Sequence, residues 1–398
     1  MTRAAIVSPL RTPIGSFLKT LSSVPAEVLA SHIIKAVVDR SHIDPERIDD
    51  VVFAQSYANS EAPCIGRWAA LAAGLPINVP GMQVDRRCGG GLQAVVTAAM
   101  MVETGAADVV LAGGVESMSN VEFYTTAMRT GMRSGSVELY DRLTRGRQRS
   151  QPESRFGPIS GMIETAENLA RDYQISREQS DALAAESHRR AASACASGKF
   201  DSEVIPISVP QKKGEAILFD KDEGIRTDTD QEKLAQLRPI FEGGVVTAGN
   251  SSQQNDASAC CLVVAEDKLV ELGLEPIAFF AGWAAAGCEP SHMGIGPVNA
   301  VERLFSRCGL VWSDIDLIEL NEAFASQVLA VLKGWQFDDH SRINVNGSGI
   351  SLGHPIAATG VRILTTMLHE LDRRKGKRAL ETMCIGGGQG IAAVFERD

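Results

Sequence analysis

The segment IIKAVVDRSHIDPERIDDVVFAQSY, residues Ile33–Tyr57, recurs later in the chain as AVERLFSRCGLVWSDIDLIELNEAF, residues Ala300–Phe324. The two segments match without a gap, and the match sets Arg40 against Arg307, Ile48 against Ile315 and Asp49 against Asp316. Each copy has the apolar spacing of a helix, then an acidic turn, then a short β-branched run. A repeat of one such unit predicts a duplicated structure.

The chain on either side of these segments alternates between short apolar runs and longer amphipathic runs. The short runs predict strands at Ala4–Val7, Asp50–Ala54, Asp108–Ala112, Leu317–Leu320 and Leu380–Ile385, and the longer ones predict helices such as Ala26–Arg40 and Val298–Arg307. Each half also carries a strand, a glycine-rich turn, a long helix and a further strand that ends in glycines. We therefore predict an α/β protein of two similar halves, in which helices cover a mixed sheet.

Residues 120–246 interrupt this pattern, and we interpret them as an inserted loop domain. The first half would then comprise residues 1–119 and 247–272, and the second half residues 273–398. The insertion holds a basic cluster of Arg142, Arg145, Arg147, Arg149 and Arg155. Such a cluster is typical of a solvated surface, although it could also meet a phosphorylated ligand.

Composition narrows the functional class. The 398 residues are 44% hydrophobic and carry a formal net charge of -10, which argues against nucleic acid as the main partner. A run of about 18 uncharged apolar residues is missing, so we expect no membrane span and a cytoplasmic location. The eight cysteines form no C-x-x-C pair, which indicates free thiols, and we expect no metal site.

Cys88 lies in VDRRCGGGLQAV, where a strand should end at Val84 and a helix should begin near Gly89 or Gly90. That helix is apolar nearly all round, so its N-terminus should point into the protein interior. Backbone N–H groups and the helix dipole there would lower the pKa of a thiol and offer donors to an oxyanion. Cys88 is thus placed as a nucleophile, although a core cysteine beside a glycine turn fits the same pattern.

Three further motifs each place a polar or thiol side chain where a predicted strand ends or a predicted helix begins. His354 lies in NVNGSGISLGHPIAATG directly before Pro355, a residue suited to the first position of a helix, so its imidazole could be a general base or simply hydrogen-bonded. Cys384 ends a strand in TMCIGGGQG, before three glycines. Asn321 follows a strand in ELNEAFA, where ordinary turn chemistry would also explain it.

Together and in this order, the four motifs resemble the thiolase family over essentially the whole chain. Further matching motifs are GGVESMS (113–119), TAEN (165–168), VTAGNSSQQND (246–256) and MGIGPV (293–298). The resemblance implies two αβαβα halves with mixed sheets and an intervening loop domain. It also implies thiolytic cleavage of a 3-ketoacyl-CoA to acetyl-CoA and a shortened acyl-CoA, or the reverse Claisen condensation, with no tightly bound cofactor.

The resemblance assigns roles to the catalytic residues. Cys88 would attack the acyl-CoA and carry the acyl group, while His354 takes its proton. Cys384 would be the general acid or base of the second half-reaction. One oxyanion site would use His354 with a water positioned by Asn321, and the other the backbone amides of Cys88 and Gly386.

The residues that would bind CoA and the acyl group follow from the same resemblance. They are Arg226, Ser252, Ala248, Met162, Met293 and Phe324. Gly161 stands where the family's biosynthetic branch commonly has a histidine, and Glu164 and Gln254 stand where apolar residues are usual. The nucleophile motif also departs from the family pattern, at Asp85 and Gly90. These departures touch no reacting group, and they favour a 3-ketoacyl-CoA with a longer or unusual acyl part over a two-carbon-specific enzyme.

Two alternatives stay open from the sequence. One is a decarboxylating ketoacyl synthase, which would lack a paired catalytic cysteine such as Cys384. The other is a catalytically idle subunit that binds acyl-CoA. Members of the family are usually homodimers or homotetramers, and enzymes of β-oxidation type are possible partners.

Overall fold

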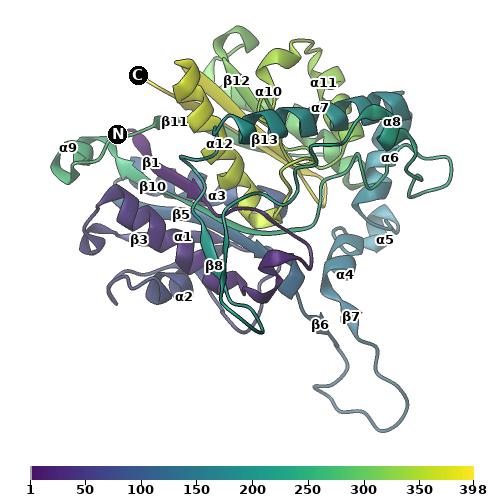
Figure 1. Ribbon diagram of the computed structural model, residues 1–398, viewed down its shortest axis with the longest axis horizontal. Coiled ribbons are helices and arrows are strands. Elements are labelled where there is room, and N and C mark those ends of the chain that lie inside the picture. Colours follow the sequence, from purple (N-terminus) through teal and green to yellow (C-terminus); the bar gives the residue numbers. More distant parts are fainter. Residues whose placement is uncertain (1) are drawn as a thin grey trace.

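The computed structural model describes residues 2–398. Its centre is a ten-stranded mixed sheet with the order β12-β13-β14-β11-β1-β10-β5-β3-β4, and β2 pairs with β10 off this path (Figure 1). The strands are β1 Ala4–Arg11, β2 Gly15–Ser16, β3 Asp50–Ala54, β4 Met82–Val84, β5 Val109–Ser117, β10 Asn255–Ala265, β11 Ala278–Gly287, β12 Leu317–Leu320, β13 Arg378–Ile385 and β14 Gln389–Glu396.

The sheet consists of two similar parts that meet at β1 and β11. These two strands pair only at Ala5 with Phe279 and at Ile6 with Ala278. In the first part β3 runs parallel to β4 and β5, and in the second β12 runs parallel to β13, while the remaining pairs are antiparallel. The predicted mixed sheets are confirmed.

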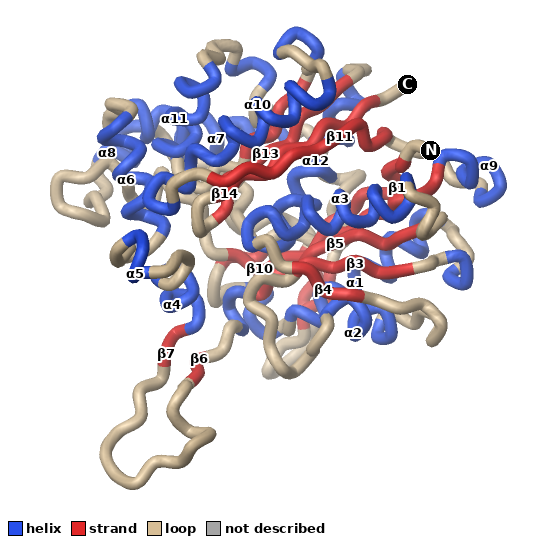
Figure 2. The backbone as a smooth tube through the Cα atoms, turned by 180° about the vertical axis from the view of Figure 1, so that it is seen from behind, coloured by secondary structure: helices blue, strands red, loops and turns tan. Residues whose placement is uncertain are grey.

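The helices form three layers around the two parts of the sheet. A central pair lies between them, and Figure 2 shows this pair with strands on both sides. The central helices are α3 Gly90–Glu103 and α12 Thr359–Arg374; the outer ones are α1 Ala26–Ser41 and α2 Ile65–Ala72 on the first part, and α10 Gly296–Cys308 and α11 Ala325–Trp335 on the second. Because each layer buries a separate apolar cluster, the duplicated αβαβα fold is confirmed.

The internal repeat is structural as well as sequential. Asp49 accepts hydrogen bonds from the backbone N–H groups of Asp108 and Val109 at 2.7 and 2.9 Å. Asp316, its counterpart, accepts from Lys377 and Arg378 at 2.7 and 3.0 Å. Each aspartate therefore ties the turn before one strand to the start of its parallel neighbour.

The predicted strands and helices are confirmed, with small differences in the residues at which they begin and end. The strands Asp50–Ala54 and Leu317–Leu320 are confirmed residue for residue, whereas the strand expected from Asp108 starts at Val109. Pro355 does not open a helix as expected, because its ψ of 72° is not helical. A 3-10 turn, η9 Ile356–Ala358, follows it and leads into α12.

The segment between the halves carries short strands and helices. They are β6 Phe123–Tyr124, β7 Tyr140–Asp141, β8 Ile207–Val209, β9 Ile217–Phe219, α4 Arg142–Gln148, α5 Glu153–Phe156, α6 Met162–Asp172, α7 Arg177–Ala196 and α8 Gln231–Ala235; α9 Leu269–Leu272 follows β10. The loop that joins β6 to β7 projects from the body in Figures 1 and 2. The expected domain boundaries at residues 119, 246 and 272 stay a prediction.

Glycines let the two central helices and their flanking turns touch backbone to backbone. A Cβ on Gly91 would lie 2.7 Å from the carbonyl oxygen of Ala357, and one on Gly360 would overlap the backbone nitrogen of Leu92. Contacts this close exclude every larger residue unless the helices separate. The starts of α3 and α12, which follow Cys88 and His354, are therefore fixed against each other.

The first prediction concerns this contact. We expect Gly360→Ala to lower the free energy of unfolding by about 1–3 kcal/mol, because the added methyl group has backbone atoms in its way. Urea unfolding measures the change. Gly287→Ala is the matched control, since its Cβ would meet nothing nearer than 3.8 Å. Equal losses in the two variants would contradict the prediction.

Candidate active site

Cys88 lies in a 3-10 turn, η3 Arg87–Gly89, that leads directly into α3. Its thiol is partly buried and packs against the central apolar cluster. The pKa of the thiol is raised, mainly by burial, although the backbone N–H of Gly386 and the Arg87 guanidinium act to lower it. The expectation of a lowered pKa is therefore wrong in direction, because burial destabilises the thiolate more than the nearby donors stabilise it.

His354 is held by three contacts at the start of α12. Its backbone N–H donates to the side-chain oxygen of Asn255 at 2.8 Å, and its Nδ1 lies 2.6 Å from the hydroxyl of Thr359. The amide nitrogen of Asn321 lies 3.5 Å from the same Nδ1. When Nδ1 carries the ring hydrogen and donates it to the Thr359 hydroxyl, Nε2 is the nitrogen left to accept a proton.

The protonation state of His354 follows from its surroundings. The residue is only 7% exposed, and burial together with the positive charges of Arg362 and Arg147 lowers its pKa to about 3. The ring is thus neutral at ordinary pH. A neutral imidazole can accept a proton from a thiol.

Cys384 occupies the end of β13, and its side chain is 1% exposed. Burial raises the pKa of its thiol well above the ordinary value, and the proximity of the Cys88 and Cys288 thiols acts in the same direction. The structure thus brings the two predicted catalytic cysteines together from opposite halves. Both are thiols at neutral pH, so each can donate a proton before it can act as a base.

Asn321 is another of the expected catalytic residues. Asn321 follows β12, and its backbone N–H donates to the carbonyl of Thr382 at 3.1 Å, next to the strand that carries Cys384. Its buried Oδ1 has no protein partner among residues 2–398. The amide of Asn321 can therefore still bind another molecule.

Three of the expected substrate-binding residues surround Cys384. Met162, Met293 and Phe324 belong to one buried apolar cluster with its thiol. A Cβ on Gly386 would lie 3.3 Å from the sulfur of Met162. The floor of the site beside Cys384 is therefore apolar.

The other expected binding residues lie together at a second place. Arg226 and Ala248 line one small pocket with His188 and Ser251, and His188 accepts a 3.2 Å hydrogen bond from the backbone N–H of Arg226. Ser252 adjoins this pocket, and its backbone N–H donates to the carbonyl of Ala323 at 2.9 Å. Since Ala323 belongs to the cluster around Cys384, the two places are linked through the backbone.

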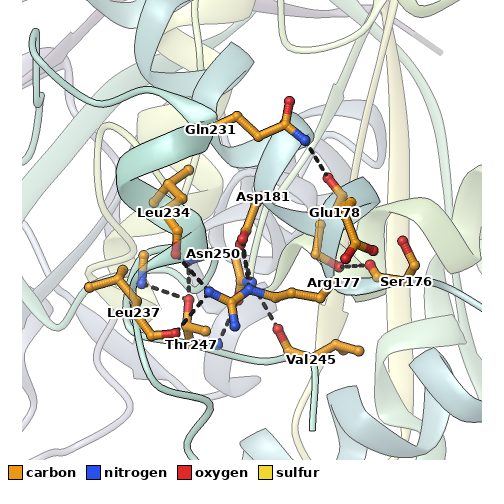
Figure 3. Close-up of polar contacts among 12 residues, drawn as sticks. Ser176, Arg177, Glu178, Asp181, Gln231, Leu234, Leu237, Val245, Thr247 and Asn250 are labelled. Carbon is orange, nitrogen blue, oxygen red and sulfur yellow. Dashed lines mark hydrogen bonds and ion pairs between the residues drawn. The ribbon is translucent and has the colours of Figure 1, made fainter.

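A polar clamp fixes the loop that carries Ala248. Asp181 on α7 accepts from the side chain of Asn250 at 2.9 Å and from the guanidinium of Arg177 at 2.6 Å (Figure 3). Arg177 also donates to the carbonyl of Leu234 in α8 at 2.6 Å. The clamp thereby joins α7 and α8 to the loop at residues 245–250.

Sequence reasoning missed three supporting residues. Thr359 and Asn255 hold His354, and Glu116 is a buried carboxyl that accepts from the backbone N–H groups of Tyr57 and Ala357 at 3.1 and 3.3 Å. Burial raises the pKa of Glu116 to about 7. All three lie inside quoted motifs, but the sequence carries no sign of which backbone groups they would reach.

The departures from the family pattern also have structural settings. Glu164 accepts from the backbone N–H and hydroxyl of Ser160 at 2.8 and 2.7 Å, and it lines a cavity of about 880 Å³ beside the start of α6. Gly161 precedes α6 with a φ of 150°, a conformation that favours glycine. The side-chain oxygen of Gln254 is buried and has no partner within residues 2–398.

The basic cluster of the insertion divides between surface and site. Arg142 pairs with Glu122, and the guanidinium of Arg145 lies 3.4 Å from the ring centre of Tyr140. Arg147 instead lies near enough to the reacting groups to lower the pKa values of Cys88 and His354. The cluster is therefore not a purely solvated surface.

Residues 2–398 hold no cluster of side chains typical of a metal site. His, Cys, Asp and Glu side chains there do not gather in threes as a bound metal ion would require. Over the same residues, the helices are too short or too polar to traverse a lipid bilayer.

Family models and known related proteins match nearly the whole chain. The family model described as "Thiolase, N-terminal domain" matches residues 4–267, and "Thiolase, C-terminal domain" matches residues 274–397. An acetyl-CoA acetyltransferase of Chromobacterium violaceum is 43% identical over 99% of both chains. A probable acetyl-CoA acyltransferase of Staphylococcus aureus is 42% identical over 100% of both chains.

Solved structures agree with these relatives. The acetyl-CoA acetyltransferase of Bacillus anthracis superimposes with a TM-score of 0.95 at 40% identity, covering 100% of this chain and 99% of that one. Human mitochondrial 3-ketoacyl-CoA thiolase in complex with CoA gives a TM-score of 0.93 at 37% identity, covering 100% and 98%.

The neutral state of His354 predicts a pH-dependent stability. Its pKa is about 3 when folded and about 6.5 when unfolded, so the unfolded chain binds more protons between these values. We expect stability to fall as pH drops through this window, by up to about 1.4 kcal/mol per pH unit, and the fall to be shallower in His354→Gln. Urea unfolding at several pH values measures it.

The control for this comparison is His42→Asn, which changes an exposed histidine at the end of α1. Its stability should follow that of the unaltered protein across the pH range. Parallel curves for the unaltered protein and His354→Gln would show that His354 is not kept neutral by burial.

Proposed function

This chain belongs to the thiolase family, and from that premise we propose which of its residues carry out thiolysis of a 3-ketoacyl-CoA and the reverse Claisen condensation. The observation that carries the proposal is the closeness of the Cys88 and Cys384 thiols. Buried His354 lies two residues before η9, the turn that packs against the turn of Cys88. Two thiols and one neutral imidazole supply a nucleophile, an acid and a base.

In the first half-reaction, Cys88 attacks the 3-keto carbon of the substrate. Because burial keeps Cys88 in its thiol form, its proton must leave, and His354 accepts it. The bond between C2 and C3 then breaks, and the acyl group stays on Cys88. The electron pair passes to the departing acetyl-CoA as an enolate, which takes its proton from the Cys384 thiol.

In the second half-reaction, the Cys384 thiolate removes the proton of a CoA thiol. The CoA sulfur attacks the thioester on Cys88, and the shortened acyl-CoA leaves. The proton held by His354 returns to Cys88, so both cysteines end as they began. In the condensing direction the same steps run backwards, with Cys384 removing the α-proton of acetyl-CoA.

The negative charge in the two half-reactions develops on different oxygens, which requires two sets of donors. We assign the enolate oxygen to His354 with a water positioned by Asn321, whose buried Oδ1 can bind it. We assign the oxyanion on the Cys88 adduct to the backbone N–H groups of Cys88 and Gly386. The N–H of Gly386 is already oriented to stabilise negative charge on the Cys88 sulfur.

CoA and the acyl group would occupy the two linked places described above. We propose that Arg226, Ser252 and Ala248 bind the CoA moiety, because Arg226 and Ala248 line one pocket and Ser252 adjoins it. A 3-ketoacyl-CoA thiolase of similar structure is known in complex with CoA. The acyl group would pass over Met162, Met293 and Phe324.

Two other functions are not favoured. A decarboxylating ketoacyl synthase would not need the paired thiol of Cys384, and an idle acyl-CoA-binding subunit would not need to keep every reacting group. The family models and the named relatives are thiolases and acyltransferases. A homodimeric or homotetrameric state, a cytoplasmic location and β-oxidation-type partner enzymes stay part of this proposal.

The acyl-enzyme is the direct test of the function. Mixing the protein with acetyl-CoA should release one CoA per chain and add one acetyl group to the Cys88 peptide, measured by mass spectrometry. Cys88→Ala should show neither. Cys384→Ala should still form the acetyl-enzyme, while its turnover in thiolysis should fall by roughly 10²–10⁴-fold because the second acid and base is gone.

Cys64→Ser is the control, since Cys64 is an exposed thiol away from the centre, and it should retain full activity. An acetyl group on a cysteine other than Cys88, with turnover intact in Cys88→Ala, would refute the assignment. A complete lack of CoA release from every acyl-CoA offered would refute the activity.

The clamp at Asp181 gives a fourth prediction. Asp181→Asn cannot accept from both Asn250 and Arg177, so the loop carrying Ala248 should loosen. We expect the KM for CoA to rise roughly tenfold with little change in kcat, since a charged hydrogen bond is lost away from the reacting atoms. Glu178→Gln on the same helix is the control, and steady-state thiolysis kinetics measure both. A fall in kcat at unchanged KM would contradict the prediction.

A further inference from the structure

A groove runs along α7 on the face of the second half, away from the thiols. α7 lies beside α11 in Figures 1 and 2 and packs against it. One end of the groove is a cavity of about 350 Å³ and the other a cavity of about 210 Å³. Glu186 and Arg190 line both cavities, so the two adjoin at these side chains.

The larger cavity is predominantly apolar. Its walls come from α7, α11 and the segment after η8, and its apolar side chains are Leu183, Val328, Leu329, Leu332 and Ile343. Its floor includes Glu322, whose carboxyl accepts from Ser187 at 2.6 Å and from Asn344 at 3.0 Å. A hydrocarbon chain could therefore displace water here and leave the Glu322 carboxyl with its hydrogen-bond donors.

The smaller cavity is basic in a protein of net negative charge. Four cationic side chains line it, Arg189, Arg190, Lys199 and Arg374, against the single carboxylate of Glu186. Glu370, buried beside it, pairs with Lys199 at 3.3 Å and Arg374 at 2.7 Å. Two carboxylates do not balance four cations, so this end of the groove attracts anions.

Arg190 marks the border between the two cavities. It donates to Glu186 at 2.7 Å and to the carbonyl of Ile343 at 2.5 Å, which holds its guanidinium in place. The lining residues of α7 extend from Gln179 to Ala194, a length of roughly 22 Å at the rise of an α-helix. An apolar section thus continues directly into a cationic one along a single helix.

We propose that this groove is a second ligand site, which binds an amphiphile made of a hydrocarbon chain and an anionic head. The chain lies against Leu183, Leu329 and Leu332, and the head meets Arg189, Lys199 and Arg374. Fatty acids and acyl phosphates or acyl-CoA share this chemistry. The site is separate from the catalytic thiols, so binding there needs no thioester and does not depend on the proposed function.

The test uses decyl phosphate, a molecule without a thioester, and isothermal titration calorimetry. We expect one molecule of decyl phosphate bound per chain. Decanol and inorganic phosphate should each bind at least roughly tenfold more weakly, because decanol lacks the anionic head and inorganic phosphate lacks the hydrocarbon chain. Decanoate, run in parallel, shows whether the head is recognised as a carboxylate or only as a phosphate. Decanol binding as tightly as decyl phosphate would overturn the proposal.

Two variants locate the binding. Ala182→Trp places an indole in the apolar cavity, and Arg189→Gln with Arg374→Gln removes two charges from the basic one. Each should weaken decyl phosphate roughly tenfold or more and leave thiolysis intact, which also shows that the variants fold. Ala196→Trp and Arg307→Gln, exposed helical positions outside the groove, are the matched controls.

Unchanged affinity in both groove variants would overturn the proposal, since the amphiphile would then bind elsewhere. A second pair of results would also overturn the proposal: decyl phosphate does not bind, and Ala182→Trp changes the oligomeric state. The groove would then be a contact between two copies of the chain.

Discussion

The backbone contact between the starts of α3 and α12 is the constraint on which the rest of this structure depends. Gly91 and Gly360 have no side chains to separate them, and the two parts of the sheet hold the helices from either side. Cys88 precedes one helix and His354 the other, so this packing contact also fixes the positions of the proposed nucleophile and the proposed base. The duplication of the fold places these two residues at equivalent ends of equivalent helices.

Burial sets the chemistry at this centre more than local charge does. Desolvation raises the pKa values of Cys88 and Cys384 and lowers that of His354, although an amide donor and an arginine oppose it at Cys88. All three groups are thereby held in their neutral forms. Proton transfer between them then separates charge only when a substrate oxygen and its donors are there to stabilise it.

The inserted segment works through the loops it holds. Asp181 and Arg177 fix the loop at residues 245–250, and Met162 at the start of α6 reaches the glycines after Cys384. Residues of the same helix α7, from Gln179 to Ala194, also line the outer groove. One helix therefore supports two surfaces, and each has its own pattern of charge.

The sequence by itself determined the duplication, the strands at residues 50–54 and 317–320 and the thiolase family, because each is written in local spacing and in ordered motifs. Only the tertiary structure decided which way the pKa of Cys88 moves, since burial depends on what packs over a residue. It also decided that Thr359, Asn255 and Glu116 support the site. Their partners lie up to 241 positions away in the chain, and no local pattern records a contact at that separation.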